Sequence, residues 1–301
     1  MEFLQPSSLA EALELKAEHP SAVPIAGGTD VMVEINFDAR RPDAMLDLTR
    51  VAELTAWAPD SADHNGADHG GGQLRVGSGV TYVRLIGELG TVLPGLAMAA
   101  RTVGSPQIRN RGTIGGNLGA ASPAGDCHPV LLATAAIIEA TSVRGTRQIP
   151  AAEYYLGPKR SALSPDELIT AVLIPRAPGP QQFAKIGTRN AMVIAVCAFA
   201  LELRPGTPAG SVGTGIGSAG PTPLRAAGAE EFLAGELAGR WGSAEPLPDE
   251  LTREFGALVA AAARPIDDVR GTAAYRKHAL SVLARRTLTW AWTAYGEDLC
   301  A

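Results

Sequence analysis

Two glycine-rich stretches have the composition of ligand-binding loops. Residues 109–126, RNRGTIGGNLGAASPAGD, contain five glycines and almost no bulky side chain, and AGGTD, residues 26–30, follows a short apolar run. Glycine lets backbone N–H groups come close to a ligand and adopts positive φ angles without strain. A diphosphate is an array of acceptor oxygens that such N–H groups would bind. Either glycine pair alone is more typical of an ordinary turn.

A third glycine motif, GIGSAG at residues 215–220, matches the GxGxxG spacing of dinucleotide-binding folds. That fingerprint requires a helix to begin at the motif, so that the first amides of the helix meet the diphosphate. Pro221 and Pro223 follow at once, and proline removes a donor and restricts the residue before it. The motif therefore predicts a strand and a turn, and no Rossmann site.

Two further groups of residues suggest chemistry less strongly. The Asp-His pairs at 63–64 and 68–69 lie in the polar, glycine-rich stretch 58–72, which favours a solvated loop over a metal site. Cys127 and His128 are adjacent, but sequence neighbours seldom face each other as nucleophile and base, so we do not expect a cysteine-histidine enzyme.

The sequence patterns of the segments around these loops predict a mixed fold of helices and strands. Ser8 and Glu11 have capping-box spacing before an amphipathic stretch that ends at Pro20, which predicts a helix. Between residues 74 and 175, short β-type runs alternate with helical ones, which is typical of an α+β domain.

The second half of the chain predicts a separate, smaller domain. PRAPGPQQ, residues 175–182, has the composition of a boundary. Strand-like segments follow it, and the alanine-rich segments 247–263 and 272–294 predict two closing helices.

Composition places the chain among ordinary globular proteins. Its 301 residues are 46% hydrophobic and 19% charged, with a net charge of −5 and no block of like charge, so we expect no nucleic-acid or membrane partner. The N-terminus lacks the pattern of an export signal, and the longest apolar run, Ala191 to Leu201, is too short to span a bilayer. Three widely spaced cysteines predict neither a disulfide framework nor a metal site, and favour the cytoplasm.

Together the two glycine loops resemble a known family. PIAGGTDVMVEI and RNRGTIGGNLGAASPAGD look like the two FAD-diphosphate loops of the medium subunit of molybdenum hydroxylases, the xanthine dehydrogenase and carbon monoxide dehydrogenase family. FAKIGTRNAMVIAV, GSAGPTPLRA and DDVRGTAAYRKHALSVLARR are similar to stretches of that subunit's C-terminal domain. The resemblance runs from Phe3 to about Trp290.

The resemblance implies an α+β fold with two domains. A two-part FAD-binding domain of the vanillyl-alcohol-oxidase (PCMH) type would occupy residues 1–176, with parts at about 1–57 and 58–176, and a small α+β domain residues 182–295. The residues that match the diphosphate loops are Ile25, Ala26, Gly27, Gly28, Thr29 and Asp30, followed by Thr113, Gly115, Gly116 and Asn117.

Three more residues match family positions around the cofactor. Asp126 would accept hydrogen bonds from the adenosine part of FAD, or cap a helix that starts at Cys127. Ile169 would pack on the isoalloxazine, or belong to the core. Lys185 would place a cation at the pyrimidine edge of the flavin, where it favours the reduced ring, or be a surface charge.

The resemblance also implies the role of the chain. Substrate oxidation at a molybdenum centre releases two electrons, iron–sulfur clusters carry them singly, and FAD would collect them for NAD+ or another acceptor. The chain has no catalytic side chain and no ligand set of its own for these centres, so molybdopterin cofactor and 2Fe-2S clusters would lie on a large molybdenum subunit and a small iron–sulfur subunit, in a dimer of heterotrimers.

Thr29 with Asp30 is more similar to the xanthine dehydrogenase branch. The alternatives are the medium subunit of a carbon monoxide or aldehyde dehydrogenase, a free-standing flavin oxidase, and a structural subunit that has lost FAD.

Overall fold

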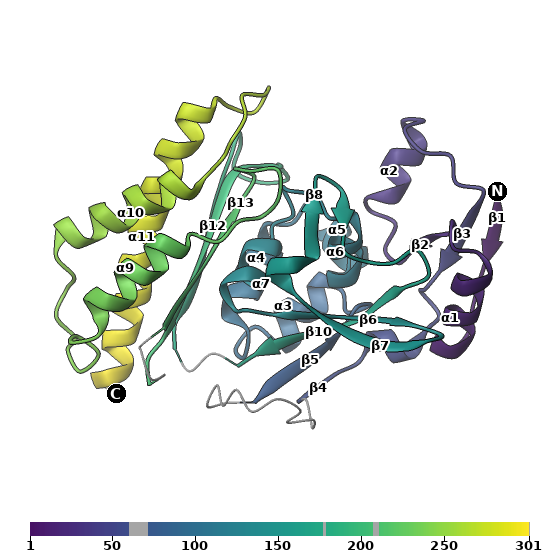
Figure 1. Ribbon diagram of the computed structural model, residues 1–301, viewed down its shortest axis with the longest axis horizontal. Coiled ribbons are helices and arrows are strands. Elements are labelled where there is room, and N and C mark those ends of the chain that lie inside the picture. The colour runs from purple at the N-terminus through teal and green to yellow at the C-terminus, as the bar shows by residue number, and fades with distance from the viewer. Residues whose placement is uncertain (60–71, 177–178, 207–210, 301) are drawn as a thin grey trace.

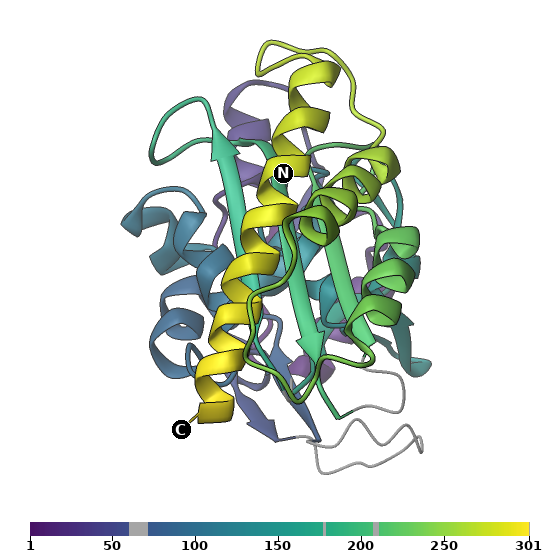
Figure 2. The same cartoon turned by 90° about the vertical axis from the view of Figure 1, so that its left-hand side faces the viewer.

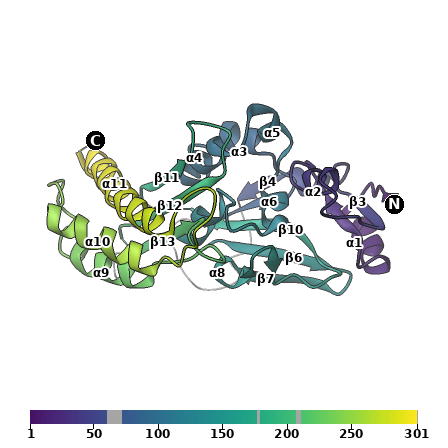
Figure 3. The ribbon, with the colours of Figure 1, turned by 90° about the horizontal axis from the view of Figure 1, so that it is seen from above.

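The chain forms three blocks that follow one another along its longest axis (Figures 1 and 3). The computed structural model describes residues 1–59, 72–176, 179–206 and 211–300. An N-terminal lobe lies at one end, a central block in the middle and a C-terminal block at the other end (Figure 1). The predicted α+β class is confirmed, with a C-terminal block that follows the N-terminal lobe and the central block.

The N-terminal lobe is a three-stranded parallel sheet with helices at its connections. The strands β1 (Glu2–Leu4), β3 (Ala44–Asp47) and β2 (Val23–Ile25) pair in that order, and the helical segments are α1 (Leu9–Glu18), α2 (Val31–Asn36) and the 3₁₀ turn η1 (Ala52–Thr55). The Ser8 hydroxyl caps α1 by accepting from the Glu11 amide at 3.2 Å. The predicted capping box also requires the Glu11 carboxylate to accept from the Ser8 amide. It accepts instead from the amide and hydroxyl of Ser7.

The central block is an antiparallel sheet covered by short helices. Its strands, in spatial order, are β4 (Trp57–Pro59), β5 (Gln73–Gly77), β10 (Leu168–Pro175), β6 (Ile137–Ser142) and β7 (Gly145–Pro150). Its helices are α3 (Tyr82–Glu88), α4 (Pro94–Thr102), α5 (Pro106–Arg111), α6 (Ile114–Ala120), α7 (His128–Ala133) and α8 (Ala151–Tyr154), and β8 (Tyr155–Gly157) pairs with β9 (Arg160–Ser161). The predicted polar loop starts later than residue 58, because β4 reaches Pro59, and both Asp-His pairs lie outside the described residues.

The C-terminal block is an antiparallel sheet with its own helices on one face and helices α4 and α7 of the central block on the other (Figures 1 and 3). Figure 2 shows its long helix running across the sheet. The sheet contains β11 (Gln181–Gly187), β12 (Ala195–Arg204) and β13 (Ser211–Gly217), and its helices are α9 (Ala227–Leu237), α10 (Asp249–Ala262) and α11 (Ala273–Cys300).

Strand β12 is apolar on both faces because both faces are covered. Ala198 and Ala200 pack in the core of the central block, whereas Phe199 and Leu201 pack against the C-terminal helices. This explains the long apolar run of the sequence, since a strand buried on two sides has no polar face. Within the described residues, no helix is both long and apolar enough to cross a membrane.

The GIGSAG motif is a strand and a turn, as its prolines predict. Gly215 lies in β13, and a Cβ at this position would overlap the backbone carbonyl of Pro129 in α7. The glycines therefore let a helix approach the sheet closely, and the next helix begins only at Ala227. Helix α9, which starts there, was not predicted, because its two glycines and small residues weaken the helical period.

Candidate functional site

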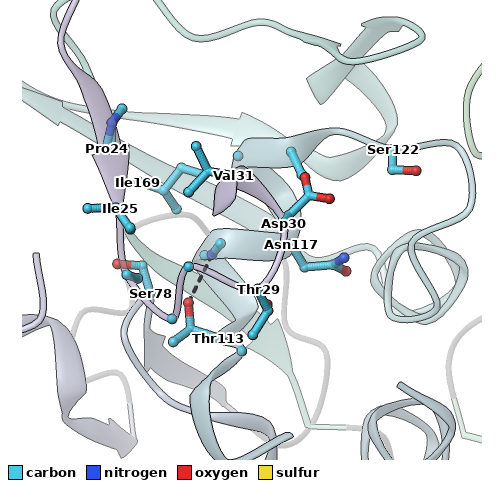
Figure 4. Close-up of a pocket in the computed structure, with 18 of the residues that line it drawn as sticks. Pro24, Ile25, Thr29, Asp30, Val31, Ser78, Thr113, Asn117, Ser122 and Ile169 are labelled. Carbon is cyan, nitrogen blue, oxygen red and sulfur yellow. Dashed lines mark hydrogen bonds between the residues drawn. The ribbon is translucent and has the colours of Figure 1, made fainter. Parts of the chain in front are cut away.

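A cavity of about 990 Å³ separates the N-terminal lobe from the central block. That volume is at the upper end of the range for small-molecule sites. Its lining includes all of residues 20–31, the start of α6, Ile169 of β10, and residues 192–194 from the C-terminal block. Figure 4 shows the first glycine loop passing the N-terminal end of α6.

The two glycine loops are in direct contact. A Cβ built on Gly27 would overlap the carbonyl oxygen of Arg111, and it would also lie 2.9 Å from the amide nitrogen of Gly112. Only glycine allows the two backbones to approach so closely. Segments separated by more than 80 residues in the sequence thus form two adjoining parts of one wall.

The first loop has a row of backbone amides without acceptors. Among the described residues, no hydrogen bond is made by the N–H groups of residues 26–31. The loop is half-buried up to Thr29, and Gly28 has a φ of 73°, which favours glycine. Asp30 precedes α2 at the capping position, but its carboxylate makes no capping hydrogen bond. These donors remain available to a ligand in the cavity.

The second loop uses its amides internally. Ile114 and Gly115 donate to the carbonyls of Val80 and Ser78, at 3.2 and 2.9 Å. Gly116 donates to the Thr113 hydroxyl at 3.0 Å, as the dashed line in Figure 4 shows, and Asn117 donates to the Thr113 carbonyl at 3.1 Å. The sequence predicted a second row of free amides here, with the Thr113 hydroxyl and the Asn117 amide as further polar partners, and the prediction of free amides is wrong for this loop.

The second loop instead offers side chains to the cavity. The Thr113 hydroxyl accepts one hydrogen bond and keeps its own proton available to donate. The Asn117 side-chain oxygen is buried and has no partner among the described residues. A buried polar atom without a partner is costly, so this end of the cavity suits a polar ligand.

Comparisons with known proteins agree with this geometry. Residues 1–177 match the model of the FAD binding domain in molybdopterin dehydrogenase, and residues 182–291 match the CO dehydrogenase flavoprotein C-terminal domain. The chain belongs to the family of FAD-binding medium subunits of molybdenum hydroxylases. It is therefore an oxidoreductase subunit, and its cofactor is FAD.

Individual relatives carry several different activities. The nicotine 6-hydroxylase medium subunit of Paenarthrobacter nicotinovorans is 31% identical over 95% of each chain. The xanthine dehydrogenase FAD-binding subunit of Escherichia coli O157:H7 is 30% identical over 97% of this chain and 96% of the relative. A carbon monoxide dehydrogenase structure from Hydrogenophaga pseudoflava superposes with a TM-score of 0.86 at 25% identity, over 98% of each chain.

The cavity fits FAD on two independent observations. The acceptor-free amides of residues 26–31 suit the diphosphate, and the unpartnered oxygens of Asn117 and Asp126 suit donors elsewhere on the cofactor. Ile169 is buried in β10 and lines the cavity, so it is available for ring contact as well as for the core.

Asp126 and Lys185 form one buried ion pair across two blocks. The Lys185 ammonium in β11 donates to Asp126 Oδ2 at 2.5 Å and to the Thr102 carbonyl at 3.2 Å. Asp126 makes no cap for α7, and its Oδ1 has no partner among the described residues. Burial raises the pKa of the Asp126 carboxyl, and the Lys185 ammonium opposes that rise.

The pair joins two residues that were predicted at different parts of the cofactor. Asp126 was predicted at the adenosine and Lys185 at the flavin, and the structure places their side chains in contact. Lys185 is also buried, so it is not a surface charge, and it does not belong to the cavity lining. Asp126 stands between it and the cavity.

Cys127 and His128 are structural. Both are fully buried, and burial raises the pKa of the Cys127 thiol, which makes it a poor nucleophile. The ring nitrogens of His128 face the carbonyls of Ser122 and Asn117 at 3.1 and 3.2 Å. Burial lowers the pKa of His128 to about 4, although both carbonyls favour the charged ring.

Some lining residues have no signal in the sequence. Ser78 receives the second loop, Met192 to Ile194 reach the cavity from the C-terminal block, and Lys16 lines it from α1. Lys16 lies in helix α1, and the sequence pattern of this helix shows only that residue 16 is one position of an amphipathic helix. Its role depends on tertiary packing that the sequence pattern does not encode.

Proposed function

We propose that this chain holds FAD between iron–sulfur clusters on a partner subunit and a final acceptor, as part of a molybdenum hydroxylase. The observation that carries the proposal is the row of acceptor-free amides at residues 26–31, facing a cavity whose adjoining wall is the second glycine loop. Bound FAD would supply the chemistry, because it accepts electrons singly and releases them as a pair. The clusters and the molybdopterin cofactor would lie on a small and a large partner subunit.

Each group of residues has a separate task in this proposal. The amides of residues 26–31 bind the diphosphate, and Thr113 and Asn117 bind it or the adjoining ribityl chain through their side chains. Ile169 limits the space beside the ring. The same contacts exclude water from the cofactor, and no side chain of this chain moves a proton to or from a substrate.

The flavin is assigned to the Asp126 end of the cavity. The pyrimidine edge of the flavin has an N–H between two carbonyls, and the unpartnered Oδ1 of Asp126 can accept from that N–H. Lys185, which contacts Asp126 from outside the cavity lining, offsets the carboxylate charge that would otherwise disfavour the reduced, negatively charged ring. We therefore assign Asp126 to the flavin N–H, with Lys185 acting through it, and the adenosine to the opposite end.

The assignment has its own test. Lys185→Met is expected to lower the midpoint potential of bound FAD, whereas Lys277→Met, the same change at an exposed position in α11, leaves it unchanged. A Lys185→Met protein with an unchanged potential but a weaker affinity for ADP would place the adenosine beside Asp126 instead.

For the substrate, we propose an N-heteroaromatic compound of the xanthine type. Thr29 with Asp30 supports this choice, as do relatives named for xanthine and nicotine at 30% and 31% identity. The second candidate is carbon monoxide or an aldehyde, since medium chains of a carbon monoxide dehydrogenase and a glyceraldehyde dehydrogenase are 28% identical. We further propose NAD+ as acceptor, a cytoplasmic location and a dimer of heterotrimers.

Co-expression separates these candidates from a free-standing flavin oxidase. The chain is purified alone and with its small and large partner subunits, and flavin absorbance is followed after addition of NADH, xanthine or an aldehyde. We expect NADH to reduce the flavin of the chain alone, and xanthine to reduce it only in the complex. Oxidation of substrate by the chain alone would overturn the proposal, and a chain that stays colourless with excess FAD would overturn the cofactor assignment.

A further inference from the structure

Lys16 is a buried cation on the wall of the FAD cavity. The residue lies in α1 with 5% of its surface exposed, and it belongs to the cavity lining. Its ammonium donates to the carbonyls of Pro20 and Ala22, at 2.8 and 2.7 Å. An ammonium has three N–H donors, so one donor of Lys16 has no partner among the described residues.

No carboxylate neutralises this ammonium at short range. Within the described residues Lys16 forms no ion pair, although nearly every other buried charge does. Burial lowers the pKa of Lys16, the more distant Asp166 carboxylate opposes that change, and Arg40 adds to it. An isolated buried cation with a spare donor is costly unless a ligand acceptor completes its hydrogen bonds.

The place of Lys16 in the fold identifies the part of FAD that it faces. It contacts the carbonyl of Ala22, directly before β2, and the diphosphate loop begins after β2. Three strand residues at about 3.3 Å each separate the two by roughly 10 Å. Asp126 is paired with the C-terminal block, whereas Lys16 belongs to the N-terminal lobe, and these lie on opposite sides of the central block (Figures 1 and 3).

The cavity around Lys16 suits a flat, uncharged heterocycle. The lining includes four apolar residues that belong to or pack on the core of the N-terminal lobe, Ala22, Leu48, Leu54 and Leu168, together with the charged side chains of Arg40 and Glu167. Adenine has ring nitrogens that accept hydrogen bonds in the plane of the ring. A buried donor beside apolar side chains is a pattern by which proteins orient such rings.

We propose that Lys16 donates a hydrogen bond to a ring nitrogen of the FAD adenine and thereby selects the dinucleotide over FMN. The inference rests on the proposed function, and specifically on the flavin lying at the Asp126 end. Lys16 is then a residue that determines which cofactor binds, and it has no part in electron transfer.

Calorimetric titration of the cofactor-free protein with FAD, ADP and FMN tests this assignment. In Lys16→Met we expect the affinities for FAD and ADP to fall together by about 10-fold or more, as for a hydrogen bond to a charged donor. The affinity for FMN and the midpoint potential should not change. Lys277→Met, the matched substitution outside the cavity, should match the wild type throughout.

A second measurement needs no variant, so it stands even if Lys16→Met does not fold. ADP analogues in which N1, N3 or N7 is replaced by CH are titrated into the wild type, and one of the three should bind about 10-fold more weakly than ADP. Equal affinity for ADP and all three analogues would overturn the inference, as would a Lys16→Met protein that binds ADP normally or loses FMN equally. Failure of the wild type to bind FAD would instead overturn the proposed function.

Discussion

The two glycine loops look alike in sequence and differ in the structure. The amides of residues 26–31 have no acceptor in the part of the chain that the structure describes, whereas the amides of residues 114–117 are bonded to Ser78, Val80 and Thr113. The first loop is a row of donors, and the second is a frame that holds the first loop in place. Within the first pair the two glycines have different purposes, because Gly27 permits backbone contact and Gly28 permits a positive φ.

This difference shows why glycine content alone does not identify a binding loop. A free amide is defined by the absence of an acceptor elsewhere in the fold, and that depends on neighbours distant in the sequence. Three substitutions test whether residues 26–31 supply donors while the second loop acts as a frame, beginning with the largest expected effect.

Gly27→Ala should separate the two loops. The new Cβ would overlap the carbonyl of Arg111, and two backbones cannot yield as a flexible side chain can. We expect a loss of about 3 kcal/mol or more in the free energy of unfolding, measured with urea, and a loss of bound FAD. The matched control is Gly119→Ala in α6, where a Cβ meets nothing within 4 Å. Equal stability of the two variants would contradict the loop contact.

His128→Gln should change how stability responds to acid. The folded-state pKa of His128 is lowered from 6.5 to about 4, so the unfolded chain binds a proton that the folded chain excludes as the pH falls from 6.5 to 4. The stability from His128 is present above pH 6.5 and is lost below it. We expect the wild type to lose about 2 kcal/mol relative to His128→Gln between pH 7 and pH 5.

Urea unfolding of both proteins at pH 7, 6 and 5 measures that difference directly, because contributions from all other groups cancel. Parallel pH dependence in the two proteins would mean that the imidazole is already charged between its two carbonyls. The frame would then be held by a charge-assisted hydrogen bond, since His128 contacts the carbonyl of Asn117.

Thr113→Val should have the smallest effect. It removes the oxygen that caps α6, which costs about 1 kcal/mol of stability, and the hydroxyl donor that faces the cavity, which weakens FAD binding roughly fivefold. Thr113→Ser should restore both properties. If Thr113→Val lowers stability but leaves FAD affinity unchanged, the hydroxyl belongs to the frame alone.

The sequence was sufficient for the fold class and for the two loops that adjoin the cavity, but not for helix α9 or for lining residues such as Ser78 and Lys16. Local signals, such as the capping serine of α1, the β-type runs of β5, β6 and β10, and the prolines after GIGSAG, each agree with the structure. The family resemblance supplied FAD and the two loops. These features depend on local patterns, which a single sequence records well.

Long-range pairing was the part that the sequence could not supply. Asp126 and Lys185 are 59 residues apart, and only the docking of β11 beside α4 joins them. Lys16 lies on a helix whose pattern gives no reason for a buried cation, and its two carbonyl partners appear only when the chain turns into β2. Partners of buried polar groups are set by tertiary packing, which periodicity does not encode.

Hydrogen–deuterium exchange of the chain with and without FAD tests the central claim most directly. We predict that FAD slows exchange at the amides of residues 26–31 and leaves those of residues 114–117 almost unchanged, because the latter are already bonded without cofactor. Strong new protection at residues 114–117, with none at residues 26–31, would contradict the account.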